Sequence, residues 1–176
     1  LFAEHEKRFG ESIRTIRTGL TLSDPDNSNK VILVTSSVVG EGKSTIAMNL
    51  ALAFARFERV LLIDADMRRP SVARELGIDA PTPGLPELLA GDAYLNKSIS
   101  LLEQYKLEVL ATGAVPSDPL ELLSLGAFSR TLDSLRETYD RIIIDSPPVL
   151  AVSDAHLLST HVDSIAYVVK FDSTTK

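Results

Sequence analysis

The sequence contains no cysteine, and this absence removes several kinds of chemistry at once. Disulfide bonds, thiolate metal sites and cysteine nucleophiles are all excluded. Histidine is also scarce. The chain has three, His5, His156 and His161, and no two have the spacing that places both imidazoles on one helix face. A zinc enzyme is therefore not expected.

Positive charge and long apolar runs are also in short supply. The chain has 18 Lys and Arg against 24 Asp and Glu, a net charge of −6, so we expect no nucleic-acid partner. No apolar run approaches the roughly 18–20 residues that span a bilayer, and no signal peptide opens the chain. The first residue is Leu1 rather than Met, from which we expect a piece of a longer protein.

The remaining composition is that of one globular domain, with 176 residues of which 44% are hydrophobic. Several short runs rich in β-branched residues are almost continuously apolar, as are strands buried on both faces of a parallel sheet. These runs are 31–35, 60–63, 142–144 and 165–169, with 107–111 as a weaker fifth. Helical patterns at 44–56 and 127–137 alternate with them. The pattern predicts a doubly wound α/β domain with a mostly parallel sheet.

The first twenty residues form a separate pattern. Apolar residues recur there at heptad-like spacing, which predicts an N-terminal amphipathic helix. They are Phe2, Phe9, Ile13, Ile16 and Leu20. A turn-rich linker at 23–29 follows, and two further loop stretches lie at 80–92, which includes a short helix, and 112–119. We therefore predict a helical unit over 1–22 and a domain over 30–176.

A phosphate-binding motif follows the first predicted strand, from Ser36 to Thr45. Its glycines let backbone N–H groups surround an anion, Lys43 reaches the β and γ phosphates, and the Ser44 hydroxyl ligates magnesium. The full pattern has glycine where this chain has Ser37, so a plain strand-to-helix turn is the alternative. The predicted ATP-binding residues are Val39, Gly40, Glu41, Gly42, Lys43, Ser44 and Thr45. The sheet is accordingly expected to be of the P-loop NTPase type.

Three aspartates follow predicted strands. Asp64 and Asp66 come at the end of one strand and Asp145 at the end of another, where they face the same crevice as the phosphate loop. For Asp64 and Asp66, the alternative is that they are solvated turn aspartates paired with Arg68 or Arg69. We predict that Mg²⁺ is held by Ser44, Asp66 and Asp145. The predicted catalytic residues are Lys43, Asp64, Asp66 and Arg68. Asp64 would orient or deprotonate the nucleophile, whereas Arg68 would stabilise transferring charge or form a surface salt bridge.

Together these motifs resemble the bacterial tyrosine kinase family of capsule and exopolysaccharide systems. The matching segments are Gly40–Thr45 (Walker A), Leu62–Pro70 (Walker A′), Ile142–Pro148 (Walker B), and the flanking 113–123 and 152–155. The chain departs from the family at Val39, usually proline, and at Asp118, usually asparagine. The resemblance implies an ATP- and Mg²⁺-dependent tyrosine autokinase that phosphorylates a C-terminal tyrosine cluster in trans. The last helix, last strand and tyrosine tail of the family are expected after Lys176.

The resemblance also implies partners. Glu11, Arg14 and Arg17 match the Glu-x-x-Arg-x-x-Arg motif that makes subunit contacts in a ring, expected here to be an octamer. An intrahelical Glu11–Arg14 pair is the alternative. A membrane polysaccharide co-polymerase region, fused upstream or separate, is implied as activator, which locates the chain at the cytoplasmic face of the bacterial inner membrane. The tyrosines of this chain are scattered, and Tyr139 and Tyr167 are expected to be core or sheet residues.

Two other functions compete with this interpretation. A positioning ATPase of the ParA/MinD type shares the fold and the strand-end aspartates, but carries a second lysine where this chain has Val38. A non-catalytic nucleotide-binding scaffold is the second. The intact set of phosphate and metal ligands argues against it.

Overall fold

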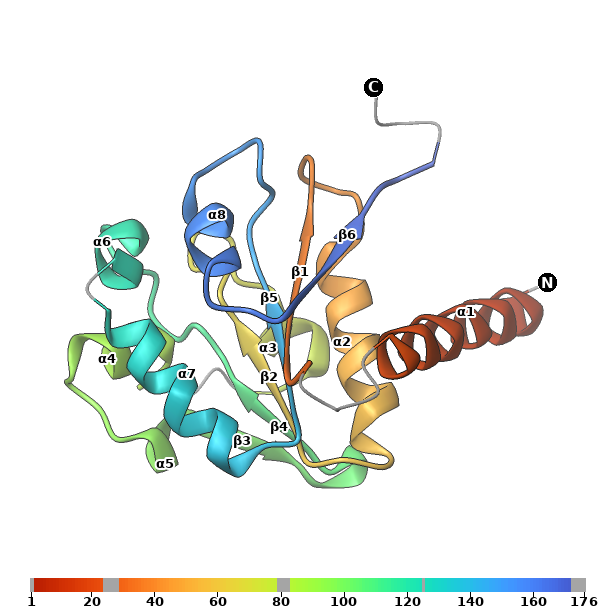
Figure 1. Cartoon of the computed structure of the whole chain (residues 1–176), viewed down its shortest axis with the longest axis horizontal. Helices are drawn as coiled ribbons and strands as arrows, with labels where there is room; N and C mark the ends of the chain where they lie inside the picture. The colour runs from red at the N-terminus through yellow and green to blue at the C-terminus, as the bar shows by residue number, and fades with distance from the viewer. Residues whose placement is uncertain (1, 24–28, 79–82, 125, 172–176) are drawn as a thin grey trace.

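The computed structural model describes residues 2–23, 29–78, 83–124 and 126–171, with side chains from residue 7 onward. Its centre is a six-stranded sheet in the order β3-β4-β2-β5-β1-β6 (Figure 1). All neighbouring strands are parallel except β3 and β4. The strands are β1 Val31–Ser36, β2 Val60–Asp64, β3 Ile99–Leu102, β4 Leu107–Leu110, β5 Arg141–Asp145 and β6 Ser164–Val168. The predicted α/β class with a mostly parallel sheet is confirmed.

Helices cover both faces of the sheet, because residues alternate between faces along each strand. Ile32 and Val34 of β1 pack in the same cluster as helix α2, whereas Val31 and Leu33 pack with α7 and α8 on the other face. Figure 1 shows α2 and α7 on opposite sides of the sheet. The helices after the first are α2 Lys43–Ala55, α3 Val72–Leu76, α4 Leu85–Ala90, α5 Leu95–Ser98, α6 Pro119–Ser124, α7 Ala127–Thr138 and α8 Asp154–Ser159, with a 3₁₀ turn, η1, at Glu103–Tyr105.

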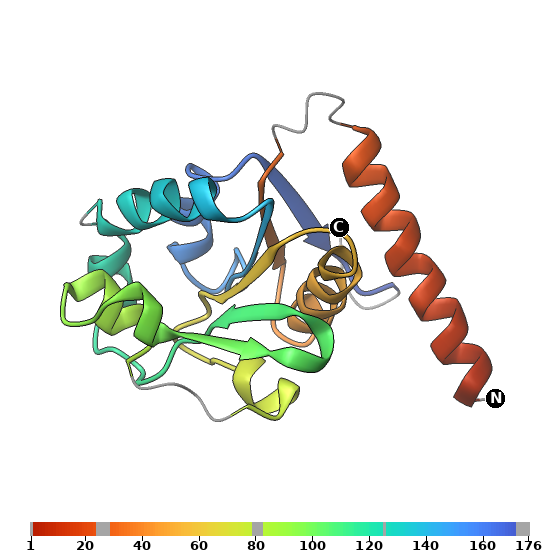
Figure 2. The same cartoon turned by 90° about the horizontal axis from the view of Figure 1, so that it is seen from below.

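Helix α1, Phe2–Leu22, confirms the predicted amphipathic helix and contacts α2. It runs along one side of the domain and projects beyond α2 (Figure 2). Ile13 is buried and Leu20 packs against the α2 cluster, but Phe9 and Ile16 of the same stripe remain 39% and 38% exposed. The domain therefore covers only part of the apolar stripe of α1.

Two differences from the predicted elements have physical causes. Strand β3 was not predicted, because its four residues include Ser100 and do not form a continuous apolar run like those of the central strands. Helices α3, α5, α6 and α8 have six residues or fewer, too short to show a periodic pattern. The predicted linker at 24–28 and residues 79–82 of the predicted loop lie outside the described residues, as do residues 172–176.

Candidate nucleotide-binding site

The phosphate loop connects β1 to α2 as the motif predicts. Gly40 and Gly42 adopt φ angles of 89° and 90°, a left-handed conformation that favours glycine, so both are needed for the turn. Gly42 directly precedes α2 and its carbonyl accepts the N–H of Ile46. The loop thus presents its backbone N–H groups and the N-terminus of a 13-residue helix to the same space. Ser37 causes no conflict in this turn, since its hydroxyl bonds to Tyr167.

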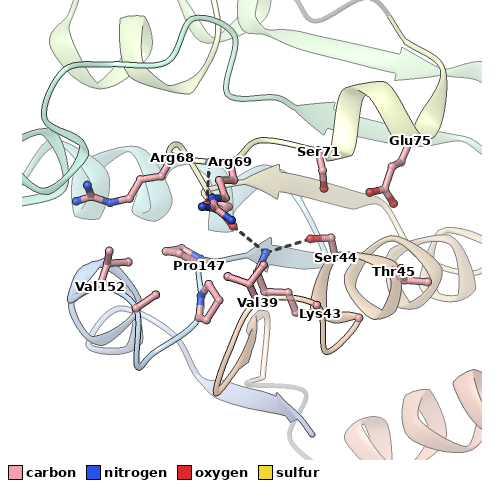
Figure 3. Close-up of a pocket in the computed structure, with 15 residues that line it drawn as sticks. Val39, Lys43, Ser44, Thr45, Arg68, Arg69, Ser71, Glu75, Pro147 and Val152 are labelled. Carbon is pink, nitrogen blue, oxygen red and sulfur yellow. Dashed lines mark hydrogen bonds and ion pairs between the residues drawn. The ribbon is translucent and has the colours of Figure 1, made fainter. Parts of the chain in front are cut away.

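Lys43 lies among the predicted metal ligands. Its Nζ atom donates to Ser44 Oγ at 3.1 Å (Figure 3). The same atom is 2.8 Å from Asp66 Oδ2 and 3.5 Å from Asp145 Oδ1. Burial lowers the pKa of Lys43, but the charge of Asp145 and the hydrogen bond to Asp66 outweigh it and hold the pKa above its ordinary value. The lysine cation therefore compensates the negative charge at the strand ends.

Asp145 is fully buried at the end of β5. Its Oδ1 atom is 3.5 Å from the ammonium group of Lys43, and within the described residues neither carboxylate oxygen accepts a hydrogen bond of ordinary geometry. Burial, opposed by the charge of Lys43, raises the pKa of Asp145 to about 6. A buried carboxylate whose oxygens lack hydrogen bonds can act as a metal ligand, because a hard cation would interact with those oxygens. The predicted role in holding magnesium therefore fits this residue.

Asp64 lies beside Asp145, its register partner on the adjacent strand β2. Its Oδ2 atom accepts the N–H groups of Ser71 and Val72, each at 3.1 Å, so Asp64 also anchors the start of α3. Its Oδ1 atom has no hydrogen-bond partner among the described residues. Burial and the charge of Asp145 raise the pKa of Asp64 to about 7. The carboxyl is therefore able to exchange a proton near neutral pH.

A pocket of about 440 Å³ opens in front of the loop, within the size range of small-molecule sites. It includes Asp66 but neither Asp64 nor Asp145, which lie deeper. The residues that complete its wall are Arg68, Arg69, Ser71, Glu75, Pro147, Pro148, Ala151 and Val152. Apart from Arg68, the residues of this wall were not predicted as site residues. They come from the segments after β2 and β5. Arg69, Pro147, Pro148 and Val152 fall within the segments that match the kinase family, but the motif gave them no separate role.

The predicted Mg²⁺ ligands are one serine and two aspartates. Among the residues that the structure describes, no three His, Asp or Glu side chains are grouped so as to hold a metal by themselves. Mg²⁺ usually takes one or two carboxylates and completes its shell with phosphate oxygens and water. The loop residue Ser44 with Asp66 and Asp145 fits this kind of site, in which the nucleotide supplies further ligands.

Arg68 is held by a buried acid. Its guanidinium donates to both oxygens of Asp154, at 2.8 and 3.1 Å, and is directed away from Lys43 (Figure 3). Asp154 is 1% exposed, so this ion pair ties the segment after β2 to α8. The salt-bridge alternative for Arg68 is thus present, and its catalytic role stays a prediction. Arg69 also lines the pocket, and its backbone N–H donates to Asp66 Oδ1.

The three motif residues of α1 lie away from this pocket. Arg14 pairs with Glu11 on the exposed helix face, as the intrahelical alternative expects. Arg17 stacks on Phe57 at 4.6 Å and donates to the carbonyl of Ala53 at 3.4 Å, both contributed by α2 or the turn after it. Their role in subunit contacts stays a prediction.

Comparison with known proteins identifies the family. A family described as an AAA domain matches residues 29–173. The tyrosine-protein kinase YwqD of Bacillus subtilis is 37% identical over 94% of this chain and 70% of its own length. The chain spans only 22% of the putative tyrosine-protein kinase EpsB of Ralstonia solanacearum, at 36% identity over 94% of this chain. The crystal structure of the VpsO kinase domain superimposes with a TM-score of 0.89 and 40% identity, covering 99% of this chain and 86% of that one.

The relatives with the competing function are more distant. The septum site-determining protein MinD of Pyrococcus horikoshii, solved with Mg-ADP, has a TM-score of 0.69 and 28% identity over 80% of this chain and 57% of that one. It shares the fold of the nucleotide-binding domain. Identity, coverage and structural agreement all favour the kinases, and the predicted resemblance is confirmed. The chain belongs to the bacterial tyrosine-protein kinase family.

Proposed function

We propose that this chain is the ATP- and Mg²⁺-dependent catalytic domain of a tyrosine autokinase. The observation that carries the proposal is the cluster of Lys43 with Asp66 and Asp145 beneath a glycine loop that starts a helix. This set provides what phosphoryl transfer needs, namely a phosphate cradle, a cation for developing charge and carboxylates for the metal. Bound Mg²⁺ supplies charge neutralisation on the β and γ phosphates.

Lys43 changes partners in this mechanism. Without nucleotide its ammonium group is 2.8 Å from Asp66 and compensates the acidic cluster. When the triphosphate enters the loop, Lys43 turns to the β and γ phosphates, and the carboxylates of Asp66 and Asp145 are released as ligands. The helix dipole and the loop N–H groups add positive potential at the same place. The charge of the cluster is thus balanced in both states.

Asp64 is the proposed proton acceptor for the tyrosine hydroxyl. Its pKa of about 7 suits a group that takes a proton near neutral pH, and its Oδ1 atom has no hydrogen-bond partner among the described residues. Asp64 does not line the pocket. The role therefore requires the shift of Lys43 to open a path from the pocket to this oxygen. Arg68, released from Asp154, is proposed to stabilise the transferring phosphoryl group.

The wider assembly is proposed from family membership. The chain acts in trans within a ring of identical subunits, an octamer, on the tyrosine-rich tail of the neighbour. Contacts through Glu11, Arg14 and Arg17 form the ring, and the exposed Phe9 and Ile16 on the same helix support an interface there. A membrane co-polymerase region activates the kinase at the cytoplasmic face of the inner membrane, and the modification regulates exopolysaccharide or capsule synthesis and export. None of the helices in the described part of the chain could span a bilayer.

The decisive experiment is an autophosphorylation assay. A longer chain that carries the tyrosine tail is incubated with MgATP and probed for phosphotyrosine. Lys43→Met should lower phosphotyrosine formation by at least about 1000-fold, as for loss of the main transition-state cation. Circular dichroism checks that the variant is folded. ATP hydrolysis without phosphotyrosine in the unmodified chain would favour the MinD-type ATPase, and full activity of Lys43→Met would reject the mechanism.

The ring is tested separately. Replacing both Arg14 and Arg17 with alanine should convert the oligomer to monomers, as measured by light scattering. Replacing Arg74 with alanine is the control, since its side chain is 78% exposed and belongs to α3 rather than to α1. An unchanged assembly in the double variant would contradict the proposed interface.

A further inference from the structure

An acidic residue occupies the centre of the phosphate loop, where a negative charge opposes the binding of a triphosphate. Glu41 is nevertheless 8% exposed. Its Oε2 atom accepts the N–H of Val38 at 2.8 Å, and its Oε1 atom accepts the N–H of Lys170 at 3.3 Å. The carboxylate is therefore turned to the protein interior and joins the start of the loop to the backbone that follows β6.

A second contact links the same two segments. The hydroxyls of Ser37 and Tyr167 are 2.9 Å apart and hydrogen-bonded, and Ser36 is the register partner of Val168. The loop is thus attached to β6 at its first residue and at its middle. These contacts also divide the loop N–H groups, because that of Val38 is bonded to Glu41 and is not available to a phosphate.

We propose that Glu41 is a positioning residue for nucleotide binding, which holds the loop N–H groups in register by joining Val38 to the backbone after β6. The inference rests on the proposed nucleotide-binding function. The two possible roles of Glu41 predict opposite changes in nucleotide affinity when its charge is removed. A carboxylate without a positioning role would only repel phosphate, so its neutralisation would tighten nucleotide binding. A carboxylate that shapes the loop would have the opposite effect when it is neutralised.

The experiment measures MgADP and MgATP binding by isothermal titration calorimetry. Glu41→Gln keeps the shape but presents an NH₂ group to one of the two N–H donors. We expect roughly 10- to 100-fold weaker binding, as for loss of a charge-assisted hydrogen bond. In the kinase assay KM for ATP should rise while kcat at saturating ATP changes by less than about 3-fold, which mere destabilisation of the fold does not produce.

Two further variants complete the design. Glu87→Gln is the matched control, because Glu87 also accepts a backbone N–H, from Gly84 at 2.9 Å, but does not line the pocket; its nucleotide affinity should be unchanged. Glu41→Asp keeps the charge but shortens the reach, so binding should again weaken; this variant decides if Glu41→Gln does not fold. Unchanged or tighter nucleotide binding by a folded Glu41 variant would overturn the positioning role of Glu41 but not the proposed kinase function. Failure of the unmodified chain to bind either nucleotide would overturn the proposed function with it.

Discussion

The two ends of the sheet carry similar charged residues in different states. At the amino ends of the strands, three acids pair with arginines and Asp140 accepts a backbone N–H. Arg59 pairs with Glu108 at 3.1 Å, and two further arginines form two-point contacts with acids. These contacts join Arg136 to Asp163 and Arg141 to Glu58. At the carboxyl ends, the single cation Lys43 lies near both Asp66 and Asp145, and Asp64 and Asp145 keep oxygens without hydrogen bonds among the described residues.

The charged residues at the two ends of the sheet affect stability in opposite directions. Paired and hydrogen-bonded charges fix one conformation and add to stability, whereas buried carboxylates with raised pKa values cost stability. A protein retains such destabilising carboxylates where they bind a ligand that offsets their cost. Carboxylates with perturbed pKa values therefore gather at functional sites. We therefore expect removal of a charge to destabilise the amino end and to stabilise the ligand-free protein at the carboxyl end.

The largest effect is expected at Arg141, which is 1% exposed. It donates to both oxygens of Glu58 and to the carbonyl of Asn29, and its guanidinium lies 4.7 Å above the ring of Phe54. Arg141→Ala removes these contacts and the packing of the side chain, so the free energy of unfolding should fall by about 3 kcal/mol in urea denaturation. Arg74→Ala is the control, since Arg74 is 78% exposed and should change it by less than about 0.5 kcal/mol. If both variants lost the same free energy of unfolding, buried and exposed ion pairs would not differ in their contribution to stability.

The next effect has the opposite sign and depends on pH. The native pKa of Asp64, about 7, lies above its ordinary value of 3.8, so the folded protein binds more protons between these values. The stability contribution of this carboxyl is lost as pH rises from about 4 to 7 and does not return above it. Asp64→Asn should therefore stabilise the nucleotide-free protein by about 2 kcal/mol at pH 8 and by much less at pH 4.

The measurement is urea unfolding at both pH values. Asn retains an oxygen for the N–H groups of Ser71 and Val72, so the anchor of α3 survives the change. Asp140→Asn is the matched control at the amino end, since Asp140 also accepts a backbone N–H, from Arg59 at 2.8 Å. It should give no stabilisation. A pH-independent gain in Asp64→Asn, or a loss, would contradict the account of the carboxyl end.

The smallest effect is expected at Tyr139, which is buried as predicted from the sequence. Its hydroxyl donates to Glu108, and burial together with that bond raises its pKa. Tyr139→Phe keeps the ring, over which Arg59 lies at 5.0 Å, and should lower the free energy of unfolding by about 1 kcal/mol. Tyr105→Phe, on an exposed turn, should leave it unchanged. Thermal unfolding of both proteins makes the comparison.

Elements that depend on local patterns could be predicted from the sequence, whereas contacts between distant residues could not. The strands around 31–35, 60–63 and 142–144 were predicted because burial on both faces leaves a continuous apolar run. The edge strand β3 was missed because its four residues include Ser100 and form no long apolar run, whereas the other edge strand, β6, was predicted from the run 165–169. Tyr167 lies in a strand as expected, but its bond to Ser37 joins residues 130 positions apart and has no local signature. The same holds for the contact of Glu41 with Lys170.

The sequence by itself determined the phosphate loop, since two glycines, a lysine and a serine at the start of a helix specify that turn through local backbone conformation. Only the tertiary structure decided which charges meet. Asp154 holds Arg68 and Asp145 lies near Lys43 because α8 and β5 bring distant segments to one edge of the sheet. Side chains pair when they are close in space. A sequence pattern predicts such a pair only where residues close in the sequence are also close in the fold.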